Sequence, residues 1–409
     1  MQAFLHKSHH GFARHWQACS LGTGCGNSSP AAPAFLLRSN SCHSTQQQCR
    51  PASSPSSSSR SSSSNKRRGL KCRAEMERMR LLGVGSAAPP TVLTNDDLAT
   101  LVDTNDEWIS TRTGIRRRHV LAKGESLTGL AVQSSLSALA MAGIKPEELD
   151  LIIFATSSPD DLFGSACQLQ ATIGAKNACG FDLTAACSGF VMGVITAGQY
   201  IRTGASKKVL VVGGDALSRF VDWRDRGTCI LFGDGCGAMV MTAAGADDSA
   251  PCALLGSAMH SDGAGQKSLN CMFSGEGVKA QLEGPAASGE GAFNNIVMQG
   301  GEVFKFAVRS VPQVIDKALA DAGMQKEQID WLVMHQANQR ILDSVAQRLG
   351  LPADHVISNL EEYGNTSAGS IPLALDAAVR SGSIKKGDVV ALAGFGAGLT
   401  WAAAIVRWG

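Results

Sequence analysis

The chain has 409 residues, of which 44% are hydrophobic, so it can bury a large core as one large domain or as two fused units. That composition excludes a disordered or fibrous protein. The 37 Lys and Arg residues nearly balance the 35 Asp and Glu residues, but the charges are unevenly distributed along the chain.

The first 75 residues differ from the rest. Glu75 is the first acidic residue, ten Lys and Arg precede it, and residues 53–64 are nearly all serine. Such a segment cannot pack a core, and its acid-free, hydroxylated composition is typical of an organelle transit peptide. We expect residues 1–75 to be removed; a permanently attached disordered linker is the alternative. Without the ten basic residues that precede Glu75, 27 basic residues face 35 acidic ones, a formal charge near −8, which disfavours nucleic acid as a partner.

The remaining part gives no signal for a metal site, a disulfide framework or a membrane span. Five of the twelve cysteines lie before Glu75, and the other seven are scattered singly with no CxxC pair. This spacing predicts neither disulfides nor a zinc site. No uninterrupted apolar stretch reaches bilayer-spanning length, so we expect this part to be soluble.

An internal duplication runs through the remaining part. The segment ALAMAGIKPEELD, which ends at Asp150, recurs without a gap as ALADAGMQKEQID, which ends at Asp330. Each copy is typical of an Ala-rich helix that ends at a glycine, followed by a turn and a buried strand, expected at residues 151–155 and 331–334. A second pair of similar segments follows in the same order.

The duplication predicts a layered α/β fold made of two halves, residues 76–250 and 251–409, which pack their sheets against shared helices. Ligands in such folds bind at the carboxyl ends of strands, where the halves meet. Residues that follow strands are therefore the first candidates for chemistry.

Cys187 lies between a strand-like segment, FDLTAA, and a helix of small residues expected to run to about Ile201. At a helix N-terminus, unpaired amides and the positive end of the dipole favour a thiolate, so the pKa of Cys187 is expected to fall from about 8.5 toward neutrality. That would make a nucleophile. The alternative is an inert core cysteine, the more common fate of a single Cys.

His335 and Asn365 come from the second half. His335 follows the second repeat's strand and replaces Ala155 of the first, which points to chemistry; a buried structural histidine is the alternative. Asn365 precedes an expected helix, and the second repeat aligns it with Cys187, which would direct both side chains to one centre. Taken alone, Asn365 is most simply a helix N-cap.

The segment GFGAGLT, residues 394–400, predicts a glycine-rich turn. Its amides could hold an oxyanion together with the amide of Cys187. The plain alternative is a tight turn between two strands.

Several segments together resemble the β-ketoacyl-acyl carrier protein (ACP) synthase III family of the thiolase superfamily. They are TAACSGF around Cys187, HQAN at His335, GNTSAGSIPLAL around Asn365, the terminal GFGAGLTWAAAIVRW, and NDEWISTRTGIR at residues 105–116. The resemblance covers essentially everything after residue 76. It implies a thiolase-like layered fold, a homodimer and no cofactor or metal, and with the leader it implies the plastid (chloroplast) stroma.

The resemblance also implies an acyltransferase that condenses acetyl-CoA with malonyl-ACP to acetoacetyl-ACP, CO₂ and CoA, and so initiates fatty-acid synthesis. Cys187 would carry the acyl group, with the amides of Cys187 and Ala397 holding the oxyanion. His335 and Asn365 would donate hydrogen bonds to the malonyl thioester as CO₂ departs. An enolate oxygen needs such donors and no strong base.

Further residues are assigned only through this resemblance. Trp108 and Arg226 would sandwich the CoA adenine, with Arg112 near a phosphate. The pantetheine and acyl tunnel would be lined by Leu231, Gly300, Phe304, Ala337 and Asn338. ACP would dock on Lys305, Arg340 and Arg348. Without the family, Trp108 would be simple packing and each cation a solvated surface charge.

Two features depart from the family pattern. Ala397 stands where the family often has another glycine, and the stretch from about His260 to Asn294 is longer and richer in Gly and Ala than in compact bacterial members. The first would narrow the acyl pocket slightly, and the second is expected to be a surface loop.

Two other functions are alternatives to a β-ketoacyl-ACP synthase III. Type III polyketide synthases share Cys, His and Asn, but they usually lack a transit peptide and the WISTRTGIR segment. A catalytically silent ACP-binding paralogue would be expected to have lost Cys187, which is retained.

Overall fold

The computed structural model describes residues 78–245, 252–275 and 291–409, all within one compact unit, Lys71–Gly409. The predicted transit peptide, residues 1–75, lies outside the described residues and stays a prediction. None of the helices in the described part is long and apolar enough to cross a membrane.

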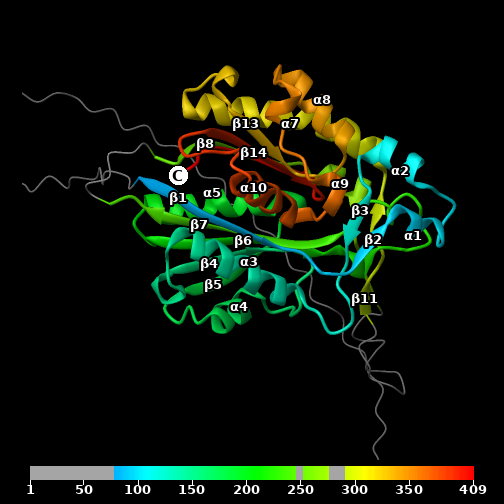
Figure 1. Ribbon diagram of the computed structural model, residues 1–409, viewed down its shortest axis with the longest axis horizontal. Coiled ribbons are helices and arrows are strands. Elements are labelled where there is room, and N and C mark those ends of the chain that lie inside the picture. Colours follow the sequence, from blue (N-terminus) through cyan, green and yellow to red (C-terminus); the bar gives the residue numbers. More distant parts are fainter. Residues whose placement is uncertain (1–77, 246–251, 276–290) are drawn as a thin grey trace, which may run out of the picture. The chain divides into compact units, whose positions relative to one another are not determined.

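Two β-sheets form the framework (Figure 1). The first has the order β1-β7-β6-β4-β5, with β4 parallel to both β5 and β6. Its strands are β1 (Met79–Ala87), β4 (Leu151–Ala155), β5 (Cys179–Leu183), β6 (Lys208–Ala216) and β7 (Asp234–Ala243). The second has the order β13-β14-β15-β8, from β8 (Leu254–Ser261), β13 (Trp331–Met334), β14 (Val389–Gly396) and β15 (Thr400–Arg407).

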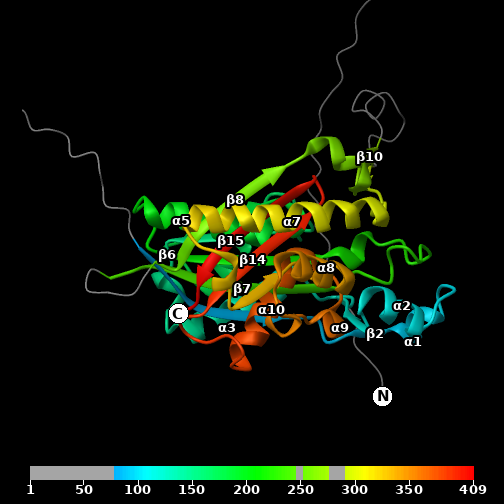
Figure 2. The ribbon, with the colours of Figure 1, turned by 90° about the horizontal axis from the view of Figure 1, so that it is seen from above.

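Helices form three layers around these sheets (Figure 1). Between the sheets lie α5 (Gly189–Arg202) and α10 (Ser370–Arg380), whose apolar side chains share one core with residues of both sheets. The helices α3 (Leu127–Ala142) and α4 (Ala166–Ile173) cover the outer face of the first sheet. The outer face of the second sheet is covered by α7 (Gly300–Ala322) and α8 (Gln339–Leu349), and Figure 2 shows α7 lying over β8 and β15. The expected layered α/β fold is therefore confirmed.

The predicted helix-to-strand repeat is present in both sheets. Helix α3 ends at Gly143, with a left-handed backbone (φ 65°), and α7 ends at Gly323 (φ 64°). A glycine accepts this conformation without the steric cost of a Cβ. A one-turn 3₁₀ helix then leads into β4 or β13. The first sheet uses strands from residues 79–243 and the second uses strands from residues 254–407. The boundary predicted at 250/251 lies outside the described residues and stays a proposal.

The remaining elements lie between these layers or at their ends. They are β2 (Val92–Thr94), α1 (Asn95–Ala99), α2 (Asp106–Thr113), β3 (Arg117–His119), α9 (Leu360–Tyr363), β9 (Leu269–Asn270), β10 (Phe273–Gly275), β11 (Gly291–Phe293) and β12 (Val297–Met298). Strand β9 pairs with β12 and β10 pairs with β11. Residues 260–294 were expected to form a surface loop; the described part is largely exposed, but backbone pairing folds it into short antiparallel ribbons.

Candidate active site

Cys187 lies in a one-turn 3₁₀ helix, Ala186–Ser188, between β5 and α5, as predicted. Ala186 just before it has a left-handed backbone (φ 45°), which a residue with a Cβ rarely adopts. This sharp turn directs the chain from the strand into the helix. Cys187 is buried, with only 7% of the residue exposed.

Ser367 joins the three predicted catalytic residues. Its hydroxyl lies 3.2 Å from the Cys187 sulfur, and its amide donates to the Asn365 Oδ1 at 2.9 Å. The Ser370 hydroxyl, which is 2.8 Å from the Ser367 carbonyl oxygen, lies 2.8 Å from the His335 Nδ1. Ser367 thus contacts Cys187 and Asn365 directly and His335 through Ser370, so the structure brings the three predicted catalytic residues together at one centre.

His335 directly follows β13 and is 2% exposed. Burial lowers the pKa of this imidazole to about 3, so the ring is neutral at physiological pH. The Ser370 hydroxyl lies 2.8 Å from both the His335 Nδ1 and the Ser367 carbonyl oxygen. The hydroxyl can donate its single proton to only one of them. If it donates to the Ser367 carbonyl, the His335 proton lies on Nδ1; if it donates to Nδ1, the His335 proton lies on Nε2.

The expectation of a lowered pKa at Cys187 is wrong for this resting site. Burial raises the pKa of the thiol to about 12, and the charge of the nearby Asp215 adds to this, while the hydrogen bond with Ser367 opposes it. Burial outweighs the effect of the helix start, and Ser367 and Gly396 of the second half are among the residues that lie against the cysteine. The resting sulfur is therefore a protonated thiol.

Asn365 is 6% exposed and lies between α9 and α10. Its Oδ1 accepts a hydrogen bond from the Ser367 amide two residues on, an Asx turn. The N-cap positions belong to Thr366 for the 3₁₀ turn and to Gly369 for α10, so the alternative of a helix N-cap is wrong. No residue in the described part accepts a hydrogen bond from its Nδ2, which leaves that amide group as a donor. A donor without a protein partner is available to a ligand.

The expected alignment of Asn365 with Cys187 is wrong. The 3₁₀ turns Ala186–Ser188 and Ser367–Gly369 both lead directly into a helix, and these helices start at Gly189 and Ser370, 181 residues apart. Cys187 therefore corresponds to Ala368. The residues that match in the sequence, Arg202 and Arg380, are the helix ends. They are 178 residues apart because α5 has 14 residues and α10 has 11.

The glycine-rich segment forms the hairpin turn between β14 and β15, with Gly396 opposite Thr400. A Cβ at Gly396 would lie 2.9 Å from the Cys187 Cβ and 3.1 Å from its nitrogen and sulfur. The hairpin therefore packs directly on the cysteine, which requires glycine at 396. Ala397, the proposed oxyanion residue, is the first residue of the turn.

Two guanidinium groups lie over the Trp108 ring. The Cζ atom of Arg112, also on α2, is 4.4 Å from the centre of the indole ring, and that of Arg226 is 4.6 Å away. Arg226 also donates to the Asp103 carbonyl at 2.7 Å. The structure thus brings together the three residues predicted for the nucleotide.

The predicted tunnel residues fall into two groups. Leu231 is buried and its carbonyl accepts the Asn365 amide at 2.9 Å, and Ala337 donates to the His335 carbonyl at 3.0 Å. Asn338 caps α8 and donates to the Arg112 carbonyl at 3.1 Å. By contrast, no hydrogen bond or ring contact among the described residues links Gly300 or Phe304, at the start of α7, to the cysteine.

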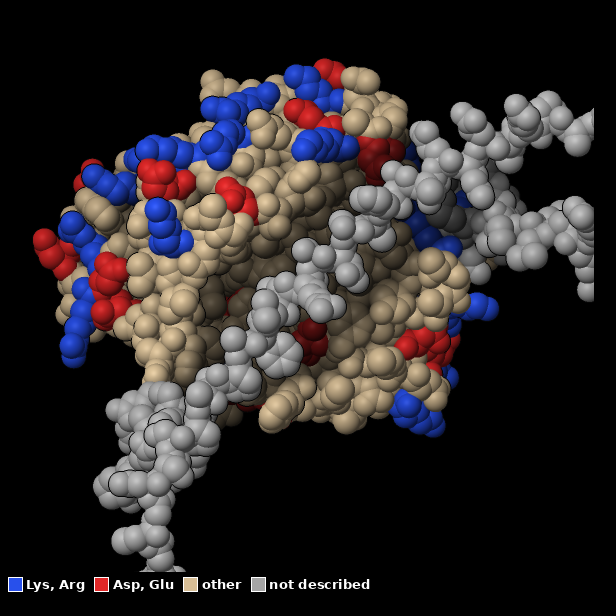
Figure 3. Space-filling model, turned by 180° about the vertical axis from the view of Figure 1, so that it is seen from behind, with Lys and Arg blue, Asp and Glu red and all other residues tan. Residues whose placement is uncertain are grey.

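The predicted ACP-binding cations lie on the outer helices. Lys305 on α7 pairs with Glu302 at 2.8 Å, whereas Arg340 on α8 donates to the Thr111 carbonyl at 3.3 Å. Arg348 lies exposed in the last turn of α8. Figure 3 shows Lys and Arg interspersed with Asp and Glu along the upper margin of its face. Each of the three predicted cations thus has its own position or partner on α7 or α8.

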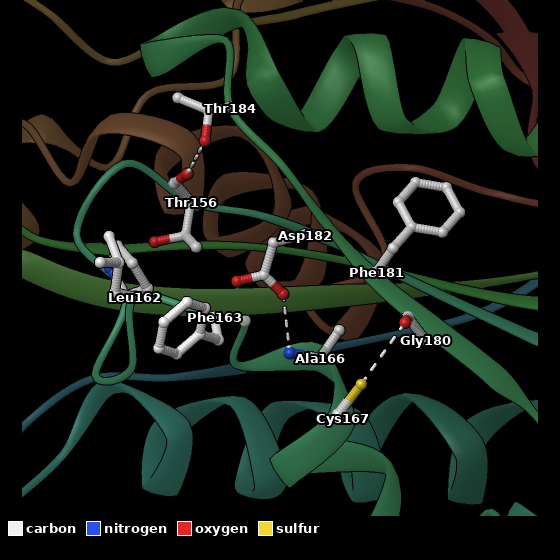
Figure 4. Close-up of a pocket in the computed structure, with 11 residues that line it drawn as sticks. Thr156, Leu162, Phe163, Ala166, Cys167, Gly180, Phe181, Asp182 and Thr184 are labelled. Carbon is white, nitrogen blue, oxygen red and sulfur yellow. Dashed lines mark hydrogen bonds between the residues drawn. The ribbon is translucent and has the colours of Figure 1, made fainter.

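A separate pocket of about 280 Å³ lies beside β5, the edge strand of the first sheet (Figure 4). It is lined by residues of β5, of α4 and of the loop that follows β4, and the three predicted catalytic residues are not among them. Leu162 and Phe163 at this pocket are 82% and 95% exposed. Among the described residues, no group of three or more His, Cys, Asp or Glu could hold a metal ion.

Two family models match the chain. Residues 181–263 match 3-oxoacyl-[ACP] synthase III, and residues 319–408 match its C-terminal part. A β-ketoacyl-[ACP] synthase III of Microcystis aeruginosa is 55% identical over 335 residues, 80% of this chain and 97% of the relative. The chloroplastic β-ketoacyl-[ACP] synthase III of Arabidopsis thaliana is 54% identical over 340 residues, 80% of this chain and 82% of the relative.

Solved structures give the same result. The 3-oxoacyl-[ACP] synthase III of Aquifex aeolicus is 41% identical with a TM-score of 0.73, covering 81% of this chain and all of that one. The priming β-ketosynthase of the R1128 polyketide pathway is 36% identical with a TM-score of 0.74, covering 82% and 97%. Fold and site thus define an acyl-condensing transferase with a thiolase-like fold. The chain belongs to the β-ketoacyl-ACP synthase III family.

Proposed function

We propose that this protein condenses an acetyl group from acetyl-CoA with malonyl-ACP, giving acetoacetyl-ACP, CO₂ and CoA, without a cofactor. The observation that carries this proposal is the convergence of Cys187 and Asn365 on Ser367, with His335 joined to them through Ser370. A nucleophile beside two neutral groups with hydrogen-bonding protons suits acyl transfer followed by enolate formation.

In the first step, the Cys187 sulfur attacks the acetyl-CoA carbonyl carbon. The main-chain amides of Cys187 and Ala397 stabilise the oxyanion, and the collapse of this intermediate releases CoA as the thiol and leaves acetyl-Cys187. The close packing of Gly396 on Cys187 supports this geometry, because it brings the β14–β15 turn beside the reacting sulfur.

In the second step, His335 and Asn365 hold the carbonyl oxygen of the malonyl thioester. If the Ser370 hydroxyl donates to Nδ1, the histidine proton lies on Nε2, and both Nε2 and the Asn365 Nδ2 are donors. Loss of CO₂ places negative charge on the oxygen that they hold. The resulting carbanion attacks the acetyl carbon and frees Cys187.

The residues predicted for substrate binding would contact CoA, the pantetheine arm and ACP. The Trp108 ring, with Arg226 and Arg112 against it, suits an adenine and its phosphates, with the two guanidinium groups moving off the ring as the base enters. Leu231, Gly300, Phe304, Ala337 and Asn338 line the path of the pantetheine arm. Lys305, Arg340 and Arg348 attract the acidic carrier protein.

The edge strand β5 supports a homodimer. Strand β5 pairs only with β4 among the described strands, so its outer edge can accept another strand. The exposed Leu162 and Phe163 lie beside this edge and add an apolar contact surface. A second copy related by a two-fold axis would cover both features.

The leader and one relative support a plastid location. Residues 1–75 have the composition of a transit peptide, and the Arabidopsis thaliana relative is named chloroplastic. Relatives from cyanobacteria are equally similar, which fits a plastid enzyme whose mature part resembles a bacterial one. We further propose that the mature part consists of two duplicated halves, residues 76–250 and 251–409.

A reconstituted reaction tests the proposal. Purified protein with acetyl-CoA and malonyl-ACP should form acetoacetyl-ACP, whereas Cys187→Ala should form none. Condensation with malonyl-CoA in place of malonyl-ACP would favour a polyketide-synthase-like enzyme. Binding of ACP without any condensation would favour a silent paralogue.

A further inference from the structure

A fully buried arginine lies beside the main-chain segment that holds Asn365. Arg118, in β3, is 0% exposed, and burial lowers its pKa to about 10, which leaves it charged at neutral pH. Its Nη2 donates to the Ile230 carbonyl at 2.7 Å and its Nη1 to the Leu93 carbonyl at 3.2 Å. In the described part of the chain its Nε has no partner, and no Asp or Glu lies within ion-pair distance of it. A charge is costly to bury without a counter-ion, so the carbonyl groups that Arg118 holds are candidates for a function.

The segment 230–233 pairs with Asn365 through the main chain. The Asn365 nitrogen donates to the Leu231 carbonyl at 2.9 Å, and the Gly233 nitrogen donates to the Asn365 carbonyl at 3.0 Å. These two hydrogen bonds lie on either side of Phe232, which forms a parallel bridge with Asn365. They fix the main chain of Asn365, so a shift of the segment 230–233 moves the base of its carboxamide.

Arg118 packs against both sides of this bridge. A Cβ added at Gly233 would lie 3.1 Å from the Arg118 Cβ, and one added at Gly364, the residue before Asn365, would lie 3.5 Å from it. The arginine therefore contacts both paired segments with its stem and holds one of them at Ile230 with its guanidinium group. Hydrogen bonds from a charged donor are shorter and stronger than those between neutral groups.

We propose that Arg118 is a positioning residue for decarboxylation, because it holds the segment 230–233 and, through it, the carboxamide of Asn365. This inference rests on the proposed function of Asn365. A displacement of about 1 Å is enough to weaken the action of such a group strongly. No hydrogen bond in the described part joins the segment 230–233 to Cys187, so the first step is expected to be nearly independent of Arg118.

The test compares two half-reactions of the full chain, namely acetylation of Cys187 by acetyl-CoA and release of CO₂ from malonyl-ACP. Arg118→Met removes the charge and the hydrogen bonds at similar volume, a change that is often neutral for stability. It should lower kcat for decarboxylation about 10- to 100-fold, with an acetylation rate within about twofold of wild type. KM should change little, because the Asn365 donor acts mainly on the charge that develops in the transition state. Arg118→Lys keeps the charge and a donor, and should recover part of the loss.

A double variant separates positioning from a general loss of stability. In Asn365→Ala the group through which Arg118 acts is gone, so adding Arg118→Met should cause no further loss of decarboxylation. Arg202→Met is the matched control, because the Arg202 Nη2 also donates to a carbonyl, that of Leu254 at 2.9 Å, but from the end of α5. This control should keep both rates.

Gly233→Ala disturbs the same bridge without removing the arginine. Its Cβ would lie 2.7 Å from the Tyr363 carbonyl oxygen, so the two paired segments must move apart. It should show the same selective loss of decarboxylation, and it carries the test if Arg118→Met does not fold.

The outcomes separate this inference from the proposed function. Normal decarboxylation in folded Arg118→Met, or in Gly233→Ala where Arg118→Met does not fold, overturns the inference alone if Asn365→Ala is impaired. Equal losses in both half-reactions, or independent losses in the double variant, overturn it as well. Normal decarboxylation in Asn365→Ala contradicts the proposed function of Asn365 itself, and the inference fails with it.

Discussion

The Cys187 sulfur lies 3.2 Å from the Ser367 hydroxyl although 180 residues separate them in the chain. Ser367 and Ala186, the residue before the cysteine, are the two non-glycine residues of the described part with a left-handed backbone, at φ 51° and 45°. Each begins a 3₁₀ turn that leads into one of the two central helices. The same sharp turn in both halves thus brings the nucleophile and its hydrogen-bond partner face to face.

Replacing His335 or Asn365 with alanine should separate the two steps. Cys187 should still accept the acetyl group, but malonyl-ACP decarboxylation should fall on the order of 100- to 1,000-fold, because the enolate oxygen loses a donor. Separate assays of acetylation and CO₂ release check this.

His355→Ala and Asn177→Ala serve as controls for these two variants. His355 stacks on Trp331 with ring centres 5.8 Å apart, and Asn177 donates to the Glu147 carbonyl on the surface. Both should keep the two activities. Loss of acetylation with intact decarboxylation in the site variants would refute the assigned roles.

His335 should make folding sensitive to acid. Burial depresses its pKa from 6.5 to about 3, so the folded state stays neutral while the unfolded state gains a proton as the pH falls through 6.5. The free energy of unfolding is highest above pH 6.5 and falls progressively toward pH 3. At pH 5 the loss is about 2 kcal/mol. Denaturant unfolding of wild type and His335→Gln at pH 7 and pH 5 measures the difference. Equal losses in both proteins would show that the histidine does not stay neutral.

Gly396→Ala should impair acetylation. The added Cβ would lie 2.9 Å from the Cys187 Cβ, so the β14–β15 turn or the cysteine must shift, at a cost of about 1–3 kcal/mol. We expect at least a tenfold slower single-turnover acetylation of Cys187. Gly263→Ala, where a Cβ meets nothing within 4 Å, should react at the wild-type rate. An unimpaired Gly396→Ala enzyme would show that this contact does not constrain the reacting groups.

The edge of the first sheet should be the dimer contact. The double substitution Leu162→Asp and Phe163→Asp places charges beside β5. It should convert the proposed dimer to a monomer in sedimentation measurements. Leu101→Asp is the control, because Leu101 is also an exposed apolar residue, at 58%, but lies after α1. A dimer that survives the double substitution would locate the contact elsewhere.

The sequence predicts much of this fold because the repeats carry local signals. The glycines at 143 and 323 end their helices, and apolar strands follow them, so each unit could be recognised from neighbouring residues. The candidate nucleophile was recognisable for the same reason, since it lies between a strand and a helix.

The electrostatics of the site could not be predicted in this way. The pKa of Cys187 depends on enclosure by segments distant in the chain, and Ser367 and Asp215 become its neighbours only in the folded protein. One signal was overlooked: the segment NTSAGS, like TAACSG, has small residues before a helix, and aligning these helix starts would have placed Ser367 beside the site.

The most direct test of this account is the mass of the protein after incubation with acetyl-CoA alone. We predict that one acetyl group is added per chain, that peptide mapping places it on Cys187, and that Cys187→Ala gains none. Acetylation of the Cys187→Ala protein at the wild-type level, with condensation intact, would contradict the account.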